Sequence, residues 1–119
     1  MSSSFDRGQR GEDIVASWLK RHKYKIIATN AKTTHYEIDI IAKRKKVLFF
    51  VEVKLRSSKT HGSGFDYITP RKLQQMNYAA QSWVATNNYT GPYKLAAASV
   101  DGASEQIVFT DEIWLENVS

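Results

Sequence analysis

Two carboxylates and a lysine are embedded in two neighbouring apolar stretches of the chain. Residues 37–42 read Glu-Ile-Asp-Ile-Ile-Ala and contain Asp39, and residues 47–54 read Val-Leu-Phe-Phe-Val-Glu-Val-Lys and end with Glu52 and Lys54. Two carboxylates plus waters are ligands that Mg²⁺ prefers, and such an ion acidifies a bound water and draws charge off a phosphate. Lys54 would offset the negative charge that grows on the phosphate oxygens. The pattern predicts metal-dependent hydrolysis of a phosphodiester.

A simpler interpretation uses the same residues. Glu52 and Lys54 could form an ion pair at a strand end, with Asp39 as a polar residue of the sheet surface. Two acids facing each other beside an apolar core would then lack a cation, which costs stability. Taken together, the three residues favour a site.

The two stretches are predicted to pair as a hairpin. Because strand side chains alternate, Ile38 and Ile40 should share one face, and Asp39 should lie on the other. An even turn centred on Arg44 and Lys45 would set Asp39 opposite Phe50 and Glu37 opposite Glu52. Asp39 and Glu52 would then be diagonal neighbours with Cβ atoms about 7 Å apart. The turn residues Lys43 to Lys46 include no Gly, Asn or Asp, so the turn type stays open, and a bulge would change the parity.

The remaining elements follow from periodicity, caps and breakers. We expect a helix over about 6–21, a strand over 24–29, a polar connection over 30–34 and a mobile loop over 57–67. Thr69-Pro70 begins a second helix that ends near Asn87-Asn88, followed by strands over 94–100 and 106–110. Residues 113–115 should pack the C-terminus down. The predicted fold class is α/β: a mixed sheet of about five strands flanked by two main helices, in the order α-β-β-β-α-β-β.

Glu12 lies one turn before Val15 and Ala16, so it can point along the buried face of the first helix. The alternative is a first-turn acid stabilised by the helix dipole. Gly8 and Gly11 weaken this turn as a helix, which suggests close approach of another backbone.

The composition limits the class of protein. A chain of 119 residues fits one domain, which we place at residues 6–117 after a flexible tail of residues 1–5. A net charge of +5 and an isoelectric point near 9.5 favour a polyanionic partner without choosing among nucleic acid, membrane and acidic protein. There is no cysteine, no apolar signal segment and no apolar run of about 20 residues, so we expect a soluble, cytoplasmic protein.

Several of these motifs together resemble the YraN-like family of small bacterial proteins, within the PD-(D/E)xK nuclease superfamily. The resemblance covers about residues 8–100 and rests on Gly11-Glu12, on Glu37 to Ala42, on Phe50 to Lys54 with Arg56, and on Lys72 and the Ala79-Ala80-x-x-Trp83 segment. It departs from the family at Tyr36, where Gly is usual, and at Ala96, where Asp is usual.

The resemblance implies a restriction-endonuclease-like core of the Holliday-junction resolvase kind. Asp39, Glu52 and the backbone carbonyl of Val53 would be ligands of Mg²⁺ or Mn²⁺, and Lys54 the catalytic lysine. Glu12 would be the first-helix glutamate that joins the catalytic and metal site.

Four cations beside this region are candidates for gripping the substrate: Arg56, Lys59, Arg71 and Lys72. The basic turn Lys43 to Lys46 is either a solvated turn or a further contact to a phosphate backbone. His22, His35 and His61 have no spacing typical of zinc or of a triad and are interpreted as surface or loop residues.

The expected function is hydrolysis of phosphodiester bonds in DNA, with branched or recombination intermediates as candidate substrates and a homodimer as a candidate assembly. The alternative is a catalytically inactive module of the same fold that binds nucleic acid or a protein partner through its basic surface.

Overall fold

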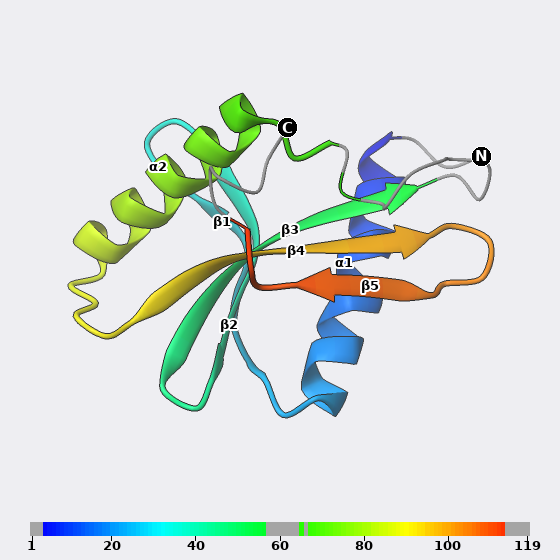
Figure 1. The fold of residues 1–119 in the computed structure, drawn as a ribbon, viewed down its shortest axis with the longest axis horizontal. Coiled ribbons are helices and arrows are strands. Elements are labelled where there is room, and N and C mark those ends of the chain that lie inside the picture. The colour runs from blue at the N-terminus through cyan, green and yellow to red at the C-terminus, as the bar shows by residue number, and fades with distance from the viewer. Residues whose placement is uncertain (1–3, 57–64, 66, 114–119) are drawn as a thin grey trace.

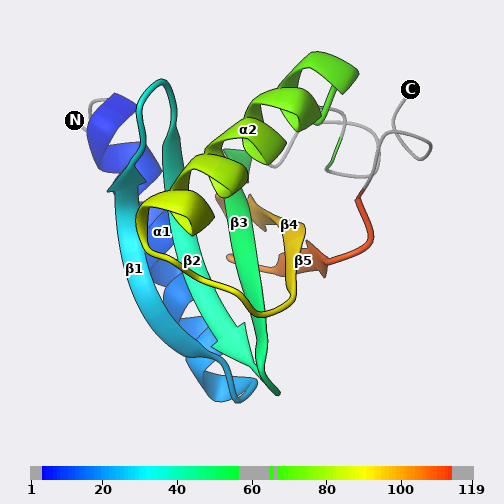
Figure 2. The same cartoon turned by 90° about the vertical axis from the view of Figure 1, so that its left-hand side faces the viewer.

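A five-stranded mixed sheet carries one helix on each face (Figures 1 and 2). The computed structural model describes residues 4–56, 65 and 67–113, and within the first helix it describes side chains from Gly8 onward. The elements are α1 (Ser4–Arg21), β1 (Lys25–Lys32), β2 (Glu37–Arg44), β3 (Val47–Arg56), α2 (Pro70–Thr86), β4 (Tyr93–Asp101) and β5 (Ile107–Thr110).

The strands lie in the order β1-β2-β3-β4-β5, and β3 and β4 are the parallel pair. The other neighbours are antiparallel. The crossover from β3 to β4 passes through α2, as a parallel connection requires. The predicted α/β arrangement and element order are confirmed.

The helix α1 packs against the sheet through one apolar face. Val15 and Leu19 are fully buried against Val51 and Val100 of the central strands. A Cβ at Gly11 would lie 3.3 Å from Leu55 Cβ, so this glycine does allow close approach to β3. No described atom lies within 4 Å of such a Cβ at Gly8, so the described residues show no close approach there. The helix also begins at Ser4, inside the stretch predicted as a tail.

The hairpin between β2 and β3 has an even turn, but not the predicted one. Its two central residues are Lys45 and Lys46, both with positive φ (52° and 68°), and Arg44 pairs with Val47. A two-residue turn with both φ values positive matches the twist of the flanking strands. Ile41 instead of Asp39 therefore faces Phe50, and the predicted pairing of Glu37 with Glu52 is wrong. Continued by one pair, the observed register would set Asp39 directly opposite Glu52.

Regular alternation in β2 breaks at Asp39. Ile40 packs in the core beneath α1, whereas both Ile38 and Ile41 pack in the core beneath α2. The prediction that Ile38 and Ile40 share a face is therefore wrong. In β1, Asn30 has a positive φ of 50°, and the strand continues to Lys32 instead of ending at Thr29. Backbone irregularities in both strands thus flank the first predicted acid.

The helix α2 begins and ends as predicted. Thr69 caps it by accepting a hydrogen bond from the backbone N–H of Lys72, Pro70 is its first residue and Asn87 follows its end. Its buried face is formed by Leu73, Met76, Ala79 and Ala80.

Two other predictions fall mainly outside the described residues. Of the predicted loop 57–67 only Phe65 and Tyr67 are described, and of residues 113–115 only Ile113, which packs near Leu73. None of the described helices is long and apolar enough to span a membrane.

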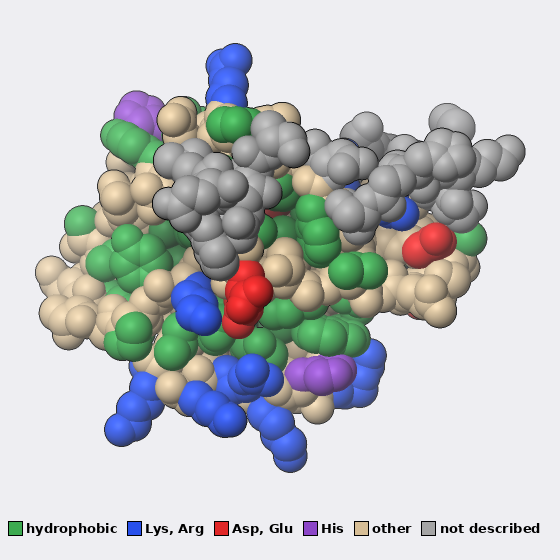
Figure 3. Space-filling model, in the orientation of Figure 1, with side chains coloured by type: hydrophobic (Ala, Val, Ile, Leu, Met, Phe, Trp, Pro, Cys, Tyr) green, Lys and Arg blue, Asp and Glu red, His purple; other side chains and the backbone are tan. Residues whose placement is uncertain are grey.

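Basic side chains gather along the edge that contains the β2–β3 turn and the C-terminal end of α1 (Figures 1 and 3). Arg44 donates a hydrogen bond to the His22 carbonyl and lies over the Tyr24 ring. Asp39 and Glu52 lie toward the opposite ends of β2 and β3. The predicted basic turn is therefore separate from the predicted acidic site.

Candidate functional site

Asp39 lies where β2 leaves β3. The ladder between these strands ends at the pair Ile40 and Val51. Beyond it, Asp39 Oδ2 accepts a 2.8 Å hydrogen bond from the backbone N–H of Val53, in place of a main-chain acceptor from β2. Because the N–H and C=O of one strand residue point to the same side, the Val53 carbonyl also faces this departure point. A carboxylate and a carbonyl from neighbouring strands thus share one location.

The charge of Asp39 is poorly compensated in this location. The pKa of Asp39 is raised from its ordinary 3.8 to about 7. Burial is the largest cause, and the charge of the nearby Glu52 carboxylate is the second. The Val53 N–H bond and Lys72 act in the opposite direction, and Glu12 adds a further increase. Two carboxylates this close, with one partly protonated near neutral pH, form a place where a cation would be stabilised.

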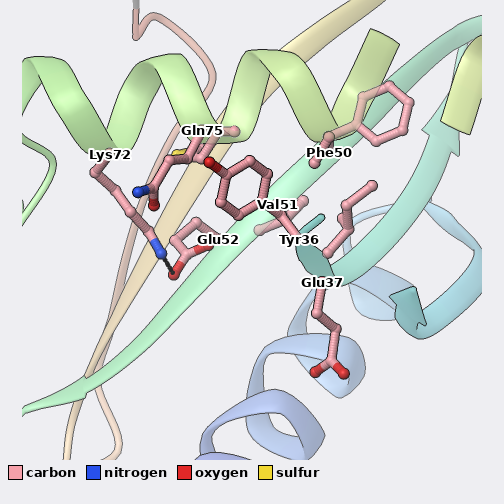
Figure 4. A pocket seen from close by; sticks show the side chains of 10 residues that line it. Tyr36, Glu37, Phe50, Val51, Glu52, Lys72 and Gln75 are labelled. Atoms are coloured by element: carbon pink, nitrogen blue, oxygen red, sulfur yellow. Dashed lines mark ion pairs between the residues drawn. The ribbon is translucent and has the colours of Figure 1, made fainter. Parts of the chain in front are cut away.

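Glu52 is held by a cation from α2 and not by Lys54. Its Oε2 lies 3.1 Å from Lys72 Nζ (Figure 4). Lys72 comes from the first turn of the helix that crosses this face of β3. Sequence reasoning placed Lys72 among the substrate cations, and the structure puts it in direct contact with a predicted metal ligand.

Glu12 approaches the same region from α1. Burial raises its pKa, the Asn30 side chain lowers it through a hydrogen bond, and Glu37, Asp13 and Glu52 raise it through their charges. Its Oε1 atom is buried without a hydrogen-bond partner among the described residues. Glu37 points away from the Lys72–Glu52 pair, toward the α1 side (Figure 4). Because the charge of Glu52 acts on Glu12, the first-helix glutamate lies near the acid pair. One of its carboxylate oxygens has no hydrogen-bond partner among the described residues.

Tyr67 is a site residue that sequence reasoning missed. Its hydroxyl is buried without a partner within the described part of the chain. Burial and then the charges of Glu52 and Asp39 raise its pKa. It lies in the sequence Phe-Asp-Tyr-Ile-Thr-Pro at the end of the predicted loop, which has no pattern that indicates contact with an acid pair, so no local signal could have found it.

The remaining predicted residues lie around this centre. Lys54 is exposed, two residues beyond Glu52 on the α2 side of β3. Arg56 is half-buried at the end of β3 with its Nε atom unpartnered among the described residues, and Arg71 is exposed on α2. Lys59 lies outside the described residues.

The donor set fits a hard divalent cation through two carboxylates and one carbonyl: Asp39, Glu52 and Val53. Mg²⁺ is commonly held by one or two carboxylates and keeps several waters. Within the described ranges, no three His, Cys, Asp or Glu side chains form a group that could hold a metal ion together. Glu12 is consequently not placed as a third side-chain ligand beside Asp39 and Glu52.

A cavity of about 250 Å³ opens between the start of β2, β3 and α2 (Figure 4). Its lining includes the ion pair of Glu52 and Lys72 as well as Tyr36 and Ile38. A concave surface that joins charged groups to aromatic ones suits a ligand with both an ionic and a flat apolar part.

Comparisons with known proteins identify similar chains. A family model described as "Uncharacterised protein family UPF0102" matches residues 11–108. A UPF0102 protein of Leifsonia xyli is 36% identical over 86 residues, which cover 72% of this chain and 73% of that protein. One of Flavobacterium psychrophilum is 39% identical over 88 residues, 74% of each chain. One of Dichelobacter nodosus is 40% identical over 86 residues, 72% of this chain and 68% of that protein.

Proposed function

The chain belongs to the uncharacterised family UPF0102, and on that premise we propose that it is a metal-dependent nuclease that hydrolyses phosphodiester bonds in DNA. The membership confirms the YraN-like resemblance. The nuclease class is our inference, and one observation carries it: the poorly compensated Asp39 carboxylate lies beside Glu52 and a strand carbonyl where β2 leaves β3.

Asp39, Glu52 and the Val53 carbonyl would hold Mg²⁺ or Mn²⁺. When bound, such an ion lowers the pKa of a water and offsets charge on the phosphate. Glu12 stays beside these ligands as a further acid, because its buried Oε1 can accept a hydrogen bond from a water in the site.

In the proposed reaction a water oxygen forms a bond to phosphorus and one bridging P–O bond breaks. The proton lost by the water passes to the Glu12 carboxylate, and the leaving oxygen takes up a proton from solvent. The Lys54 ammonium, on the face of β3 that carries Glu52, offsets the charge that grows on the non-bridging phosphate oxygens.

The substrate would be gripped by the cations that surround the acids: Arg56, Lys59, Arg71 and Lys72. The net charge of +5 supports a polyanionic substrate. The location that we propose is the cytoplasm, where the protein would meet DNA. Branched and recombination intermediates are the favoured substrates, and a homodimer would match their paired strands.

A strand-cleavage assay tests this function. Labelled single-stranded, duplex and four-way-junction DNA would be incubated with Mg²⁺ or Mn²⁺ and with wild type, Glu52→Gln or Lys54→Gln. We expect metal-dependent cleavage by wild type and a loss of at least about 100-fold in each variant, the scale of removing one transition-state contact. Equal cleavage by wild type and Glu52→Gln would contradict the proposal.

The second candidate is an inactive module of the same fold that binds nucleic acid or a protein. It is favoured by the Lys72–Glu52 ion pair, which satisfies Glu52 without a metal. This module would bind DNA equally well with and without divalent ions, with affinity that falls steeply with salt. Divalent ions would also leave its melting temperature unchanged, because only a ligand of the folded state raises it.

A further inference from the structure

Three exposed aromatic rings form a cluster beside the candidate site. His35 and Tyr36 come from the connection before β2, and Tyr78 comes from α2. The ring centroid of Tyr78 lies 5.4 Å from that of His35 and 6.0 Å from that of Tyr36. Tyr36 keeps 38% and Tyr78 49% of its surface exposed, so the contacts among the rings leave ring surface open to solvent.

A hollow of about 540 Å³ lies over this cluster, within the size range of small-molecule sites, roughly 300–1,000 Å³. Its lining adds a cation and two amides to the three rings: Arg71, Gln74 and Gln75. Arg71 is exposed on the first turn of α2, next to Lys72. The hollow therefore offers flat aromatic surface, amide groups that can both donate and accept hydrogen bonds, and positive charge.

The hollow adjoins the cavity that holds the acid and its cation. Tyr36 and Gln75 line both spaces, and the smaller one is also lined by Glu52 and Lys72 (Figure 4). Tyr36 lies between the start of β2 and α2, alongside Gln75 (Figure 4). A chain molecule with a ring in the hollow could thus extend directly past Lys72 to Glu52.

We propose that the surface formed by His35, Tyr36 and Tyr78 stacks an unpaired nucleobase of the substrate strand, next to the phosphate that the acid pair acts on. This inference rests on the proposed nuclease function and deepens it by naming the substrate class. Aromatic rings stack on any base face that is not already stacked, and cations beside them meet the adjoining phosphates. Bases within a regular duplex are stacked on each other, so the surface selects single-stranded, flap or junction DNA over continuous duplex.

Fluorescence anisotropy in EDTA tests the surface without any cleavage. The probes are a labelled 12-nucleotide oligo(dT) and a 12-base-pair duplex, with wild type, Tyr36→Ala, Tyr78→Ala, the matched Tyr36→Phe and Tyr78→Phe, and Val108→Ala as an exposed apolar control in β5. We expect each alanine variant to lose roughly 5- to 150-fold in affinity for oligo(dT), the range of one stacked base, and to bind duplex within about two-fold of wild type. The phenylalanine variants and Val108→Ala should bind both probes like wild type. Circular dichroism melts confirm that each variant is folded.

Unchanged oligo(dT) binding by both alanine variants, or equal losses on the two probes, would overturn the inference. The same variants tested for cleavage separate the two proposals. Wild type could show metal-dependent cleavage that has no preference for single strands and is unaffected by the alanine changes. That result would refute the stacking surface and support the nuclease function. Binding of oligo(dT) that depends on the tyrosines, without any cleavage, would support the stacking surface and refute the nuclease function.

Discussion

The Asp39 carboxylate accepts a 2.8 Å hydrogen bond from the backbone N–H of Val53, across the point at which β2 leaves β3. This contact holds a charged group in a half-buried place that a regular hairpin would fill with main-chain hydrogen bonds. Burial and Glu52 disfavour the charged form of Asp39, and the Val53 N–H favours it. The separation of the two strands thus leaves a pair of carboxylates that a bound cation would stabilise.

The first prediction concerns stability without metal. The pKa of Asp39 is raised from 3.8 to about 7, so between these values the folded chain holds a proton that the unfolded chain releases. This contribution to stability is complete below about pH 4 and lost as pH rises through about 7. In urea unfolding with EDTA, the free energy of unfolding of wild type should fall as pH rises from about 5 to 8. The fall in Asp39→Asn should be smaller by on the order of 2 kcal/mol.

Asparagine keeps an acceptor for the Val53 N–H, so the comparison isolates the charge. Asp13→Asn, at an exposed position of α1, is the matched control and should behave like wild type. The same pH dependence in Asp39→Asn and wild type would refute the assignment.

The second prediction concerns the cation on Glu52. Lys72 Nζ lies 3.1 Å from Glu52 Oε2, so it would compete with a metal for that carboxylate. Lys72→Gln should tighten Mg²⁺ binding at pH 8 by roughly 2- to 5-fold, the scale of a partly exposed ion pair. Calorimetric titration measures the change, with Lys25→Gln, an exposed lysine of β1, as control. Weaker or unchanged binding in Lys72→Gln would show that the ion pair does not compete.

The third prediction concerns the buried Tyr67 hydroxyl. It has no hydrogen-bond partner in the described part of the chain, so Tyr67→Phe should leave the free energy of unfolding unchanged or raise it by up to about 1 kcal/mol. Tyr89 is the contrast, because its hydroxyl donates a 2.8 Å bond to the Pro92 carbonyl. Tyr89→Phe should lose about 1 kcal/mol in the same denaturation experiment. A larger loss in Tyr67→Phe than in Tyr89→Phe would contradict this.

The fourth prediction compares two glycines of α1. Alanine is favoured over glycine in a helix by about 1 kcal/mol. The added Cβ of Gly8→Ala meets no described atom within 4 Å, so this change should stabilise the fold by about 0.5–1 kcal/mol. A Cβ at Gly11 would lie 3.3 Å from Leu55 Cβ and 3.5 Å from Val53 Cγ1. Crowding of this kind costs about 1–3 kcal/mol, so Gly11→Ala should be neutral or destabilising in thermal melts. Equal stabilisation by both changes would mean that α1 moves away from β3 without cost.

Most of the fold could be predicted because its signals are local. The Thr69-Pro70 start of α2 depends only on a capping hydroxyl and a fixed φ, and both are observed. The register of the hairpin could not be predicted, because Lys45 and Lys46 adopt positive φ without the Asn or Gly that usually marks such a turn. Residues 30–34 read as a polar connection, yet Ala31 and Lys32 pair with Ile38 and Glu37 at the start of β2.

The candidate site could be predicted only in part. Asp39 and Glu52 stand out because charge in apolar strands is costly, and the alternation of β3 places Glu52 on the α2 face with Phe50. Asn30, Tyr67 and the Lys72 contact arise from tertiary placement of distant segments. The pattern along the chain does not indicate that Asn30, Tyr67 and Lys72 lie beside the acids, so a structure was needed to find them.

Calorimetric titration of Mg²⁺ and Mn²⁺ into wild type, Asp39→Asn and Glu52→Gln tests the central claim, that this acid pair holds a divalent cation. We predict saturable binding to wild type, release of a proton at about pH 6.5 because the raised pKa of Asp39 must be overcome, and loss of binding in both variants. Binding of equal affinity in wild type and Asp39→Asn, or no binding to wild type at any pH between about 6 and 9, would contradict the account.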